Sequence, residues 1–220
     1  MNEILMQFNT GLAAVSEQVL PALVQIRHGR NGAGAGTIWH ADGLIVTNAH
    51  VVSNRRVSQP ALTVHLADGR AYAPRLLAVD SERDLALLRI DTHDLPAIAL
   101  GNSQQLQPGE MVFAFGFPWG VTGGATSGVV IGVGAQVGNL RSTQEWVAAS
   151  LHLRPGHSGG PMVDVVGRLI GINTLMNGPD VGVAIPVDVV KRFVQAAYTQ
   201  QRHSSTVDPQ AVGVLQTVVV

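Results

Sequence analysis

The 220-residue sequence contains no cysteine, which excludes disulfide bonds, thiolate metal sites and a cysteine nucleophile. Charged residues are also scarce, because Asp, Glu, Lys and Arg make up only 13% of the chain while apolar residues make up 46%. This balance is typical of a folded protein and argues against intrinsic disorder. The net charge of −1 arises from 14 basic and 15 acidic residues. With no basic stripe among them, a nucleic-acid partner is not expected.

Long apolar runs are missing as well. No stretch of about 18 apolar residues predicts a membrane span, and the N-terminus lacks the basic start, apolar core and cleavage site of a signal peptide. The eight histidines show no metal-ligand spacing such as His-Glu-x-x-His. His152 and His157 could share one face of a site, but no carboxylate lies near them in the sequence. We therefore expect neither a metal nor another cofactor.

Two segments have the periodicity of amphipathic helices. The first predicts an N-terminal helical segment over 1–23, whose apolar stripe packs either on the body of the protein or on a neighbouring subunit. The second predicts a closing helix over 187–201, opened by Pro186. The apolar stripe of the first segment consists of Ile4, Leu5, Phe8, Leu12, Val15, Val19 and Leu23.

The region between these helices has short, β-branched-rich runs separated by Gly, Pro, Asn and Asp, which is typical of many short strands. No alternation of strands with helices indicates a parallel sheet. The pattern predicts an all-β fold of two antiparallel barrels, a double β-barrel with an N-terminal and a C-terminal helix, in one domain over 24–202. A seam between the barrels is expected near 100–109. The runs cover 34–39, 43–47, 62–66, 75–79, 85–90, 111–116, 128–137, 146–150, 161–165 and 169–175.

The strongest chemical signal is the segment Gly-His-Ser-Gly-Gly-Pro over 156–161. Glycines around a serine allow a sharp turn and bring amide N–H groups close to a reacting carbonyl. Ser158 is therefore a candidate nucleophile, and the amides of Gly156 and Ser158 are the candidate oxyanion-hole donors. Taken alone, the segment could also be an ordinary hairpin loop.

Two further residues supply the partners that a nucleophilic serine needs. His50 ends the apolar run that starts at 43, and a neutral imidazole can take a serine proton near pH 7 and return it to a leaving amine. Asp84 stands at the mouth of the run 85–90, where a carboxylate needs a partner such as the second N–H of His50. Each residue alone could be structural. The order His, Asp, Ser along the chain is nevertheless that of the chymotrypsin arrangement.

Together these segments resemble the HtrA/Deg group of chymotrypsin-like serine proteases, in the same order over residues 24–200. The motifs are Gly-Ala-Gly-Thr at 34–37, Gly-Leu-Ile-Val-Thr-Asn-Ala-His-Val-Val at 43–52, Asp-Leu-Ala-Leu-Leu-Arg-Ile at 84–90, Ala-Phe-Gly-Phe-Pro-Trp-Gly at 114–120, Thr-Ser-Gly-Val-Val at 126–130, Pro-Gly-His-Ser-Gly-Gly-Pro at 155–161, Gly-Ile-Asn-Thr at 171–174 and Val-Ala-Ile-Pro at 183–186. The resemblance implies a trypsin-like peptidase domain that cleaves unfolded or damaged polypeptides without ATP.

The resemblance also implies a homo-oligomer, often a trimer, and an extracytoplasmic location such as the periplasm or cell envelope. It further matches six residues to the primary specificity pocket. Because no acid lies at the base of this pocket, the residue before the scissile bond is expected to be small or medium-sized and apolar. The six residues are His152, Leu153, Thr174, Leu175, Met176 and Ala184.

The segment before the nucleophile departs from the family pattern. His157 stands where the group usually has Asn, and Ser150, His152 and Arg154 lie in a stretch that commonly reads Asp-Ala-x-Ile-Asn. Because His157 adjoins Ser158, it could change the loop geometry or the local protonation balance. A second hypothesis therefore stays open, in which the protein is a resting or non-catalytic binder of exposed apolar segments, a holdase or sensor.

The C-terminal residues 203–220 have the pattern of a polar linker followed by an apolar, strand-like run over 212–220. The run resembles the first strand of a PDZ domain in the same family. Two interpretations follow: the run leads into a PDZ domain, or it docks on its own or a neighbouring body, for example in the active-site cleft. An exposed apolar strand promotes aggregation, so we expect it to be paired.

Overall fold

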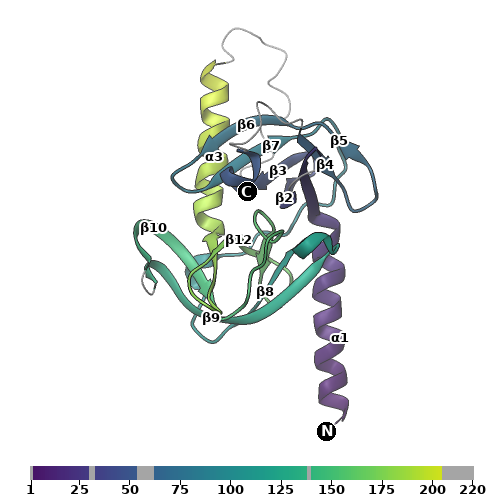
Figure 1. Ribbon diagram of the computed structural model, residues 1–220, viewed down its shortest axis with the longest axis vertical. Coiled ribbons are helices and arrows are strands. Elements are labelled where there is room, and N and C mark those ends of the chain that lie inside the picture. The colour runs from purple at the N-terminus through teal and green to yellow at the C-terminus, as the bar shows by residue number, and fades with distance from the viewer. Residues whose placement is uncertain (1, 30–32, 54–61, 138–139, 205–220) are drawn as a thin grey trace.

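The computed structural model describes residues 2–29, 33–53, 62–137 and 140–204, which form two β-sheets flanked by helices (Figure 1). Of the predicted C-terminal segment 203–220, residues 203–204 belong to the last helix, and the rest, with the strand-like run, lies outside the described residues. The all-β organisation in two bodies is confirmed, and every strand pairing within the sheets is antiparallel.

The first body is a seven-stranded sheet in the order β5-β4-β1-β2-β3-β7-β6. Its adjacent strands β3 and β7 are buried along almost their whole length. A closed barrel was expected here, but the end strands β5 and β6 do not pair with each other, so the sheet stays open. A two-residue β5 offers too few backbone groups to close it. The strands are β1 (Leu23–His28), β2 (Ala33–His40), β3 (Leu44–Thr47), β4 (Leu62–His65), β5 (Ala71–Tyr72), β6 (Arg75–Asp80) and β7 (Leu85–Arg89).

The second body is a closed six-stranded barrel in the order β10-β13-β12-β11-β8-β9, completed by the pairing of β9 with β10. Closure leaves no free strand edge. Its interior is filled by apolar side chains such as Val112, Val147 and Met162, all fully buried. The strands are β8 (Met111–Gly116), β9 (Gly124–Val137), β10 (Leu140–Ala149), β11 (Pro161–Val163), β12 (Leu169–Met176) and β13 (Gly182–Pro186).

Helix α3 (Val187–Ser204) joins the two bodies, because it packs on β12 and β13 of the barrel and on β6 and β7 of the open sheet. The connection between the bodies runs from β7 to β8, contains the short helix η2 (Ser103–Gln105), and includes the predicted seam. Asp188 fixes this connection to α3. One of its carboxylate oxygens accepts from both the N–H and the hydroxyl of Ser103, at 2.8 and 2.6 Å, and the other accepts from Lys191 at 3.1 Å.

Helix α1 (Asn2–Val19) extends away from both bodies for most of its length (Figure 1). Its C-terminal residues Val15 and Val19 are buried in the main core. Near its start, Ile4 is 73% exposed and Phe8 is 51% exposed. The predicted apolar stripe therefore packs on the body only in its second half.

Removing the Asp188 carboxylate should destabilise the fold. Burial alone would raise the pKa of Asp188, but the bonds from Ser103 and Lys191 outweigh it and hold the pKa below 3.8. The ion pair therefore stabilises the protein above that pH and ceases to do so as pH falls through the folded pKa. We expect Asp188→Ala to lower the unfolding free energy by about 1–3 kcal/mol at neutral pH. Urea denaturation measures this, and the exposed Glu82→Gln serves as the control. An Asp188→Ala protein as stable as the control would contradict the assignment.

Candidate active site

His50 and Asp84 meet where strand β3 of the open sheet ends and strand β7 begins. His50 lies on the short helix α2 (Ala49–Val52) directly after β3, and Asp84 lies in the turn between β6 and β7. The ring Nδ1 of His50 is 2.8 Å from one Asp84 carboxylate oxygen and 3.0 Å from the other, and the His50 backbone N–H also donates to Asp84 at 3.0 Å. With the Nδ1 proton directed at the carboxylate, Nε2 keeps its lone pair and can act as a base.

The Asp84 carboxylate has a further partner from the barrel. The hydroxyl of Thr174 on β12 donates to Asp84 Oδ2 at 2.6 Å, and Asn48 donates its side-chain amide to the Asp84 carbonyl at 3.0 Å. Burial alone would raise the pKa of Asp84, but the hydrogen bonds from His50 and Thr174 outweigh it and hold the pKa below its ordinary value. Asp84 is therefore ionised at neutral pH and can stabilise a protonated His50.

Ser158 lies in the loop between β10 and β11, at the contact of the two bodies. Its backbone carbonyl accepts from Ala35 N–H of β2 at 2.8 Å, and its hydroxyl donates to the Thr174 carbonyl at 3.2 Å. The neighbouring Gly159 has φ +84, and a Cβ there would meet the Ala35 carbonyl oxygen at 2.1 Å. Only glycine therefore allows this close approach of the serine loop to β2. Thr174 contacts Ser158 through its carbonyl and Asp84 through its hydroxyl.

Residues 154–157 form a tight turn ahead of the nucleophile. The His157 N–H donates to the Arg154 carbonyl at 3.0 Å. Pro155 occupies the second position of the turn, and Gly156 occupies the third with φ +107. Proline followed by a residue with positive φ is the pattern of a type II turn. Among the described residues, none accepts a hydrogen bond from the N–H of Gly156 or Ser158. Both predicted oxyanion-hole donors are thus available to a ligand.

The ring of His157 is almost fully buried behind this turn. Its Nδ1 lies 3.0 Å from the Arg154 amide nitrogen and 3.1 Å from the Arg154 carbonyl oxygen, while Nε2 has no hydrogen-bond partner within the described part of the chain. Burial lowers the pKa of His157 below 6.5, so the neutral ring is favoured. The residue that stands in place of the family's Asn therefore still bonds the turn, but it also places a titratable group in a buried position.

The six residues matched to the specificity pocket separate into three groups. Leu153 and Ala184 are buried in the barrel core, and Met176 packs against that core and accepts from the Leu153 N–H through its sulfur at 3.1 Å. His152 is half exposed and lies 3.3 Å from Asp180. Leu175 is 38% exposed. The Thr174 hydroxyl donates a hydrogen bond to the Asp84 carboxylate. Sequence reasoning missed this role of Thr174, because no local pattern marks a contact across 90 residues.

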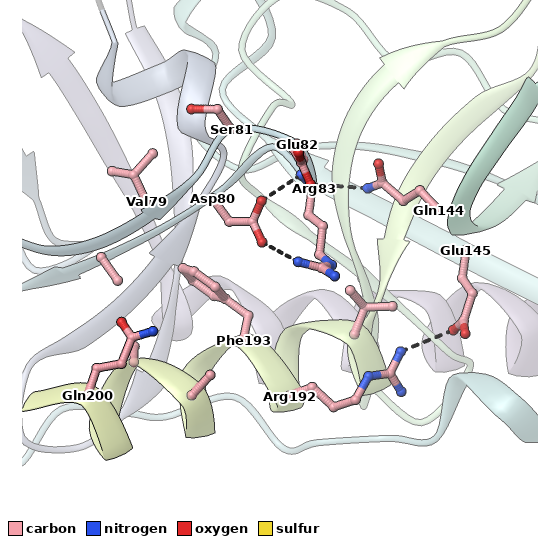
Figure 2. Close-up of a pocket in the computed structure, with 14 residues that line it drawn as sticks. Val79, Asp80, Ser81, Glu82, Arg83, Gln144, Glu145, Arg192, Phe193 and Gln200 are labelled. Atoms are coloured by element: carbon pink, nitrogen blue, oxygen red, sulfur yellow. Dashed lines mark hydrogen bonds and ion pairs between the residues drawn. The ribbon is translucent and has the colours of Figure 1, made fainter. Parts of the chain in front are cut away.

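A cavity of about 700 Å³ lies beside the turn that carries Asp84, between that turn, β10 and the part of α3 from residue 189 to residue 200. Figure 2 shows ion pairs of Asp80 with Arg83 and of Glu145 with Arg192 at its rim, and Gln144 directed at Arg83. The Gln144 side chain donates to the Arg83 carbonyl at 3.1 Å. None of the predicted catalytic residues lines the cavity. It is therefore distinct from the candidate active site.

The described residues hold no group of three or more His, Asp or Glu side chains able to bind a metal. In the same part of the chain, no helix is long and apolar enough to cross a membrane.

Comparisons with known proteins identify the family and the fold. Residues 34–172 match the family model "Trypsin-like peptidase domain". The chain is 34% identical to "Serine protease HTRA1" of Xenopus laevis over 86% of this chain and 44% of the relative, and 37% identical to "Serine protease HTRA3" of Rattus norvegicus over 83% and 43%. It thus spans less than half the length of these relatives. The solved structure "HtrA-type protease AlgW with tripeptide" is 32% identical, with a TM-score of 0.75, over 84% of this chain and 62% of that one. The predicted chymotrypsin-like fold is therefore confirmed.

The buried His157 should make the protein sensitive to acid. Because its folded pKa lies below 6.5, the unfolded chain binds the proton more readily, and the unfolding free energy decreases as pH falls from about 6.5 toward the folded pKa. We expect His157→Asn to lose less stability over this pH range, measured by urea denaturation in steps of pH. The exposed His93→Asn is the matched control. If His157→Asn follows the same pH dependence as wild type, the ring is not held neutral by burial.

Proposed function

Since the chain belongs to the trypsin-like peptidase domain family and is a protease domain of the HtrA type, we propose that it is a serine endopeptidase with the catalytic triad His50, Asp84 and Ser158. The observation that carries the proposal is the contact of His50 Nδ1 with the Asp84 carboxylate at 2.8 Å. This contact orients the imidazole with Nε2 as a base, which is the arrangement that activates a serine.

The proposed reaction is acyl transfer. The Ser158 hydroxyl turns away from the Thr174 carbonyl and attacks a peptide carbonyl carbon, while His50 takes its proton and passes it to the leaving amine. The amides of Gly156 and Ser158 stabilise the negative oxygen of the tetrahedral intermediate. Water then attacks the acyl-enzyme, with His50 again as the base, and releases the second product. Asp84 keeps His50 in the required tautomer and stabilises its charged form.

The proposed substrates are unfolded or damaged polypeptides, cleaved after a small or medium-sized apolar residue. The similarity to the HTRA serine proteases and to a protease structure that holds a tripeptide supports a polypeptide substrate. The apolar surroundings of Leu153, Met176 and Ala184 are compatible with an apolar side chain at the cleavage site. An extracytoplasmic location stays a prediction from the family resemblance.

Replacing the nucleophile should abolish cleavage and leave the fold intact. We expect Ser158→Ala to reduce turnover by about 10⁶-fold, and Asp84→Asn by about 10⁴-fold because the imidazole loses its orientation and charge partner. The assay is digestion of unfolded β-casein followed by mass spectrometry of the fragments, with circular dichroism as the folding control. Labelling by a fluorophosphonate should require Ser158. Binding of casein without cleavage or labelling by the wild-type chain would favour the holdase or sensor hypothesis instead.

We also propose that the protein is a homo-oligomer and that the exposed part of α1 contributes to its interface. Leu5, Phe8, Leu12, Val15 and Val19 follow alternate spacings of three and four, as in a coiled-coil seam. The body covers only the end of this seam, and Leu5 remains 64% exposed. No Lys or Arg occurs before residue 25, so an anionic lipid surface is a poor alternative partner.

Introducing a charge into this seam should dissociate the oligomer. We expect Phe8→Glu to shift the mass measured by light scattering after size-exclusion chromatography from the oligomer, a trimer by family resemblance, to the monomer. Gln7→Glu places the same charge at an exposed neighbouring position and should leave the mass unchanged. A wild-type chain that is monomeric at micromolar concentration, or a Phe8→Glu oligomer of unchanged mass, would refute this role of α1.

A further inference from the structure

Arg154 carries a positive charge beside the proposed nucleophile that no carboxylate balances. The guanidinium groups of Arg83, Arg168 and Arg192 each pair with an Asp or Glu. The Arg154 guanidinium forms no ion pair within the described part of the chain, and it lies over the indole ring of Trp119, at 5.2 Å from the ring centroid. Arg154 is also one of the positions at which the sequence departs from the family pattern. The unbalanced charge is therefore a feature of this chain rather than of its family.

Trp119 presents a large apolar ring to solvent. It lies in the short helix η3 (Pro118–Gly120), in the loop between β8 and β9, with φ 49 and ψ 29. This is a left-handed conformation that bulky residues rarely adopt. The residue is 74% exposed, so packing in the core does not account for a tryptophan at this position. Strained residues cluster at ligand-binding sites, and tryptophan and arginine are enriched among the residues that contribute most to binding. Both observations favour a role in binding.

The contact with the indole prepares the Arg154 guanidinium for an anion. A guanidinium that lies over a ring uses its face and leaves the N–H groups along its edge for other acceptors. These N–H groups form a planar fork that matches the two oxygens of a carboxylate. Because the contact with Trp119 restricts the long arginine side chain, less conformational entropy is lost when a ligand binds. The pair is thus suited to bind a carboxylate.

The pair lies on the side of Ser158 that the leaving part of a substrate would occupy. The second half of the loop over 154–160 contacts β12, where the Ser158 hydroxyl donates to the Thr174 carbonyl at 3.2 Å. The first half contacts the loop between β8 and β9, where the Trp119 N–H donates to the Pro155 carbonyl at 3.2 Å. The proposed pocket for the residue before the scissile bond uses β12 and β13. The residues after the bond therefore extend away from β12, toward the loop that carries Trp119.

From these contacts we infer that Arg154 and Trp119 determine specificity on the leaving-group side, where they select substrates with an acidic residue shortly after the scissile bond. The inference rests on the proposed function, because it assigns the pair to the same active site. An endopeptidase cuts within a chain, so the carboxylate is that of an Asp or Glu side chain. The guanidinium binds this carboxylate, and the Trp119 ring holds the guanidinium. Neither side chain touches the reacting atoms.

The experiment compares peptides that differ by one side chain. Each peptide has the same neutral sequence before the cleavage site, an amidated C-terminus, and a single Glu or its uncharged isostere Gln at the first, second or third position after the site. Three extended residues span about 10 Å, so the series covers the surface next to the nucleophile. We expect the wild-type protein to cleave the best Glu peptide with a kcat/KM about fivefold above that of its Gln partner, since partly exposed ion pairs contribute little more. The difference should lie mainly in KM, because the ion pair forms in the ground state as well as in the transition state.

Variants separate recognition from catalysis. Arg154→Met removes the charge but keeps a side chain that can cover the ring, and we expect the preference for Glu to disappear. Arg154→Glu should prefer a Lys peptide to the Gln peptide instead. Trp119→Leu should weaken the preference for Glu, because the guanidinium loses its support. A general loss of activity affects both peptides of a pair and cancels in their ratio.

The matched control is Arg75→Met, which removes a positive charge at an exposed position of β6 and should keep the wild-type ratio. A wild-type protein without a preference for Glu at any of the three positions would overturn the inference. An Arg154→Met protein that keeps the wild-type ratio would overturn it as well. An unchanged ratio in Trp119→Leu would contradict the role of the ring.

A binding measurement does not require cleavage. Of the three tryptophans, Trp39 and Trp146 are buried and Trp119 is exposed, so a fluorescence change on adding peptide reports mainly Trp119. In the Ser158→Ala protein, we expect the Kd of the Glu peptide to be about fivefold below that of the Gln peptide. The fluorescence change should be lost when Trp119→Phe is added.

Equal affinity for the two peptides, or no fluorescence change with either, would refute the inference. A change that persists with Trp119→Phe would place the peptide elsewhere and refute it too. If the wild-type chain neither cleaves casein nor reacts with a fluorophosphonate, the proposed function fails. The titration then still decides whether Arg154 and Trp119 bind an acidic peptide.

Discussion

The Asp84 carboxylate is the point on which the rest of the site depends. It accepts from His50 of the open sheet twice, at the ring and at the backbone, and from Thr174 of the closed barrel. These contacts fix the imidazole and also tie the two β bodies together beside the nucleophile. Because the carboxylate is largely shielded by these partners, the loss of one of them would leave a partly buried charge unsatisfied, which costs more than the bond itself contributes. The chemistry and the junction of the two bodies therefore rely on the same group.

Local sequence patterns were sufficient to propose the candidate residues that a short segment specifies. Ser158 and Gly156 stand in a glycine-rich turn, His50 follows a buried strand, and Asp84 precedes one, so each is proposed from its neighbours. The contact of Thr174 with Asp84 could not, because it joins residues brought together only by the packing of β12 against the open sheet. The periodicity of α1 was read correctly, yet it does not say which turns of a helix the body covers. The length of β5, and with it the open first sheet, likewise depends on tertiary contacts.

The departures from the family pattern become understandable once the loop is seen in three dimensions. His157 hydrogen-bonds the turn through one ring nitrogen, as a shorter polar side chain could, but it buries a second nitrogen that finds no partner in the described part of the structure. The guanidinium of Arg154 lies over the indole of Trp119. The sequence marked both positions as unusual. Their consequences required the distances, because neither the buried nitrogen nor the stacked guanidinium follows from residue type.

Backbone strain is concentrated around this site. Among the described residues, three other than glycine have positive φ, and two of them are Asp84 and Trp119. Such conformations persist only where surrounding contacts over-determine them. Asp84 is held by His50, Thr174 and Asn48, and Trp119 by Pro155 and Arg154. In both places the strained residue bonds a segment of the candidate active site: the Asp84 carboxylate bonds the ring of His50, and the N–H of Trp119 donates to the Pro155 carbonyl of the turn over 154–157. The strain is therefore offset by the same contacts that hold the proposed triad and the turn before Ser158 in one arrangement.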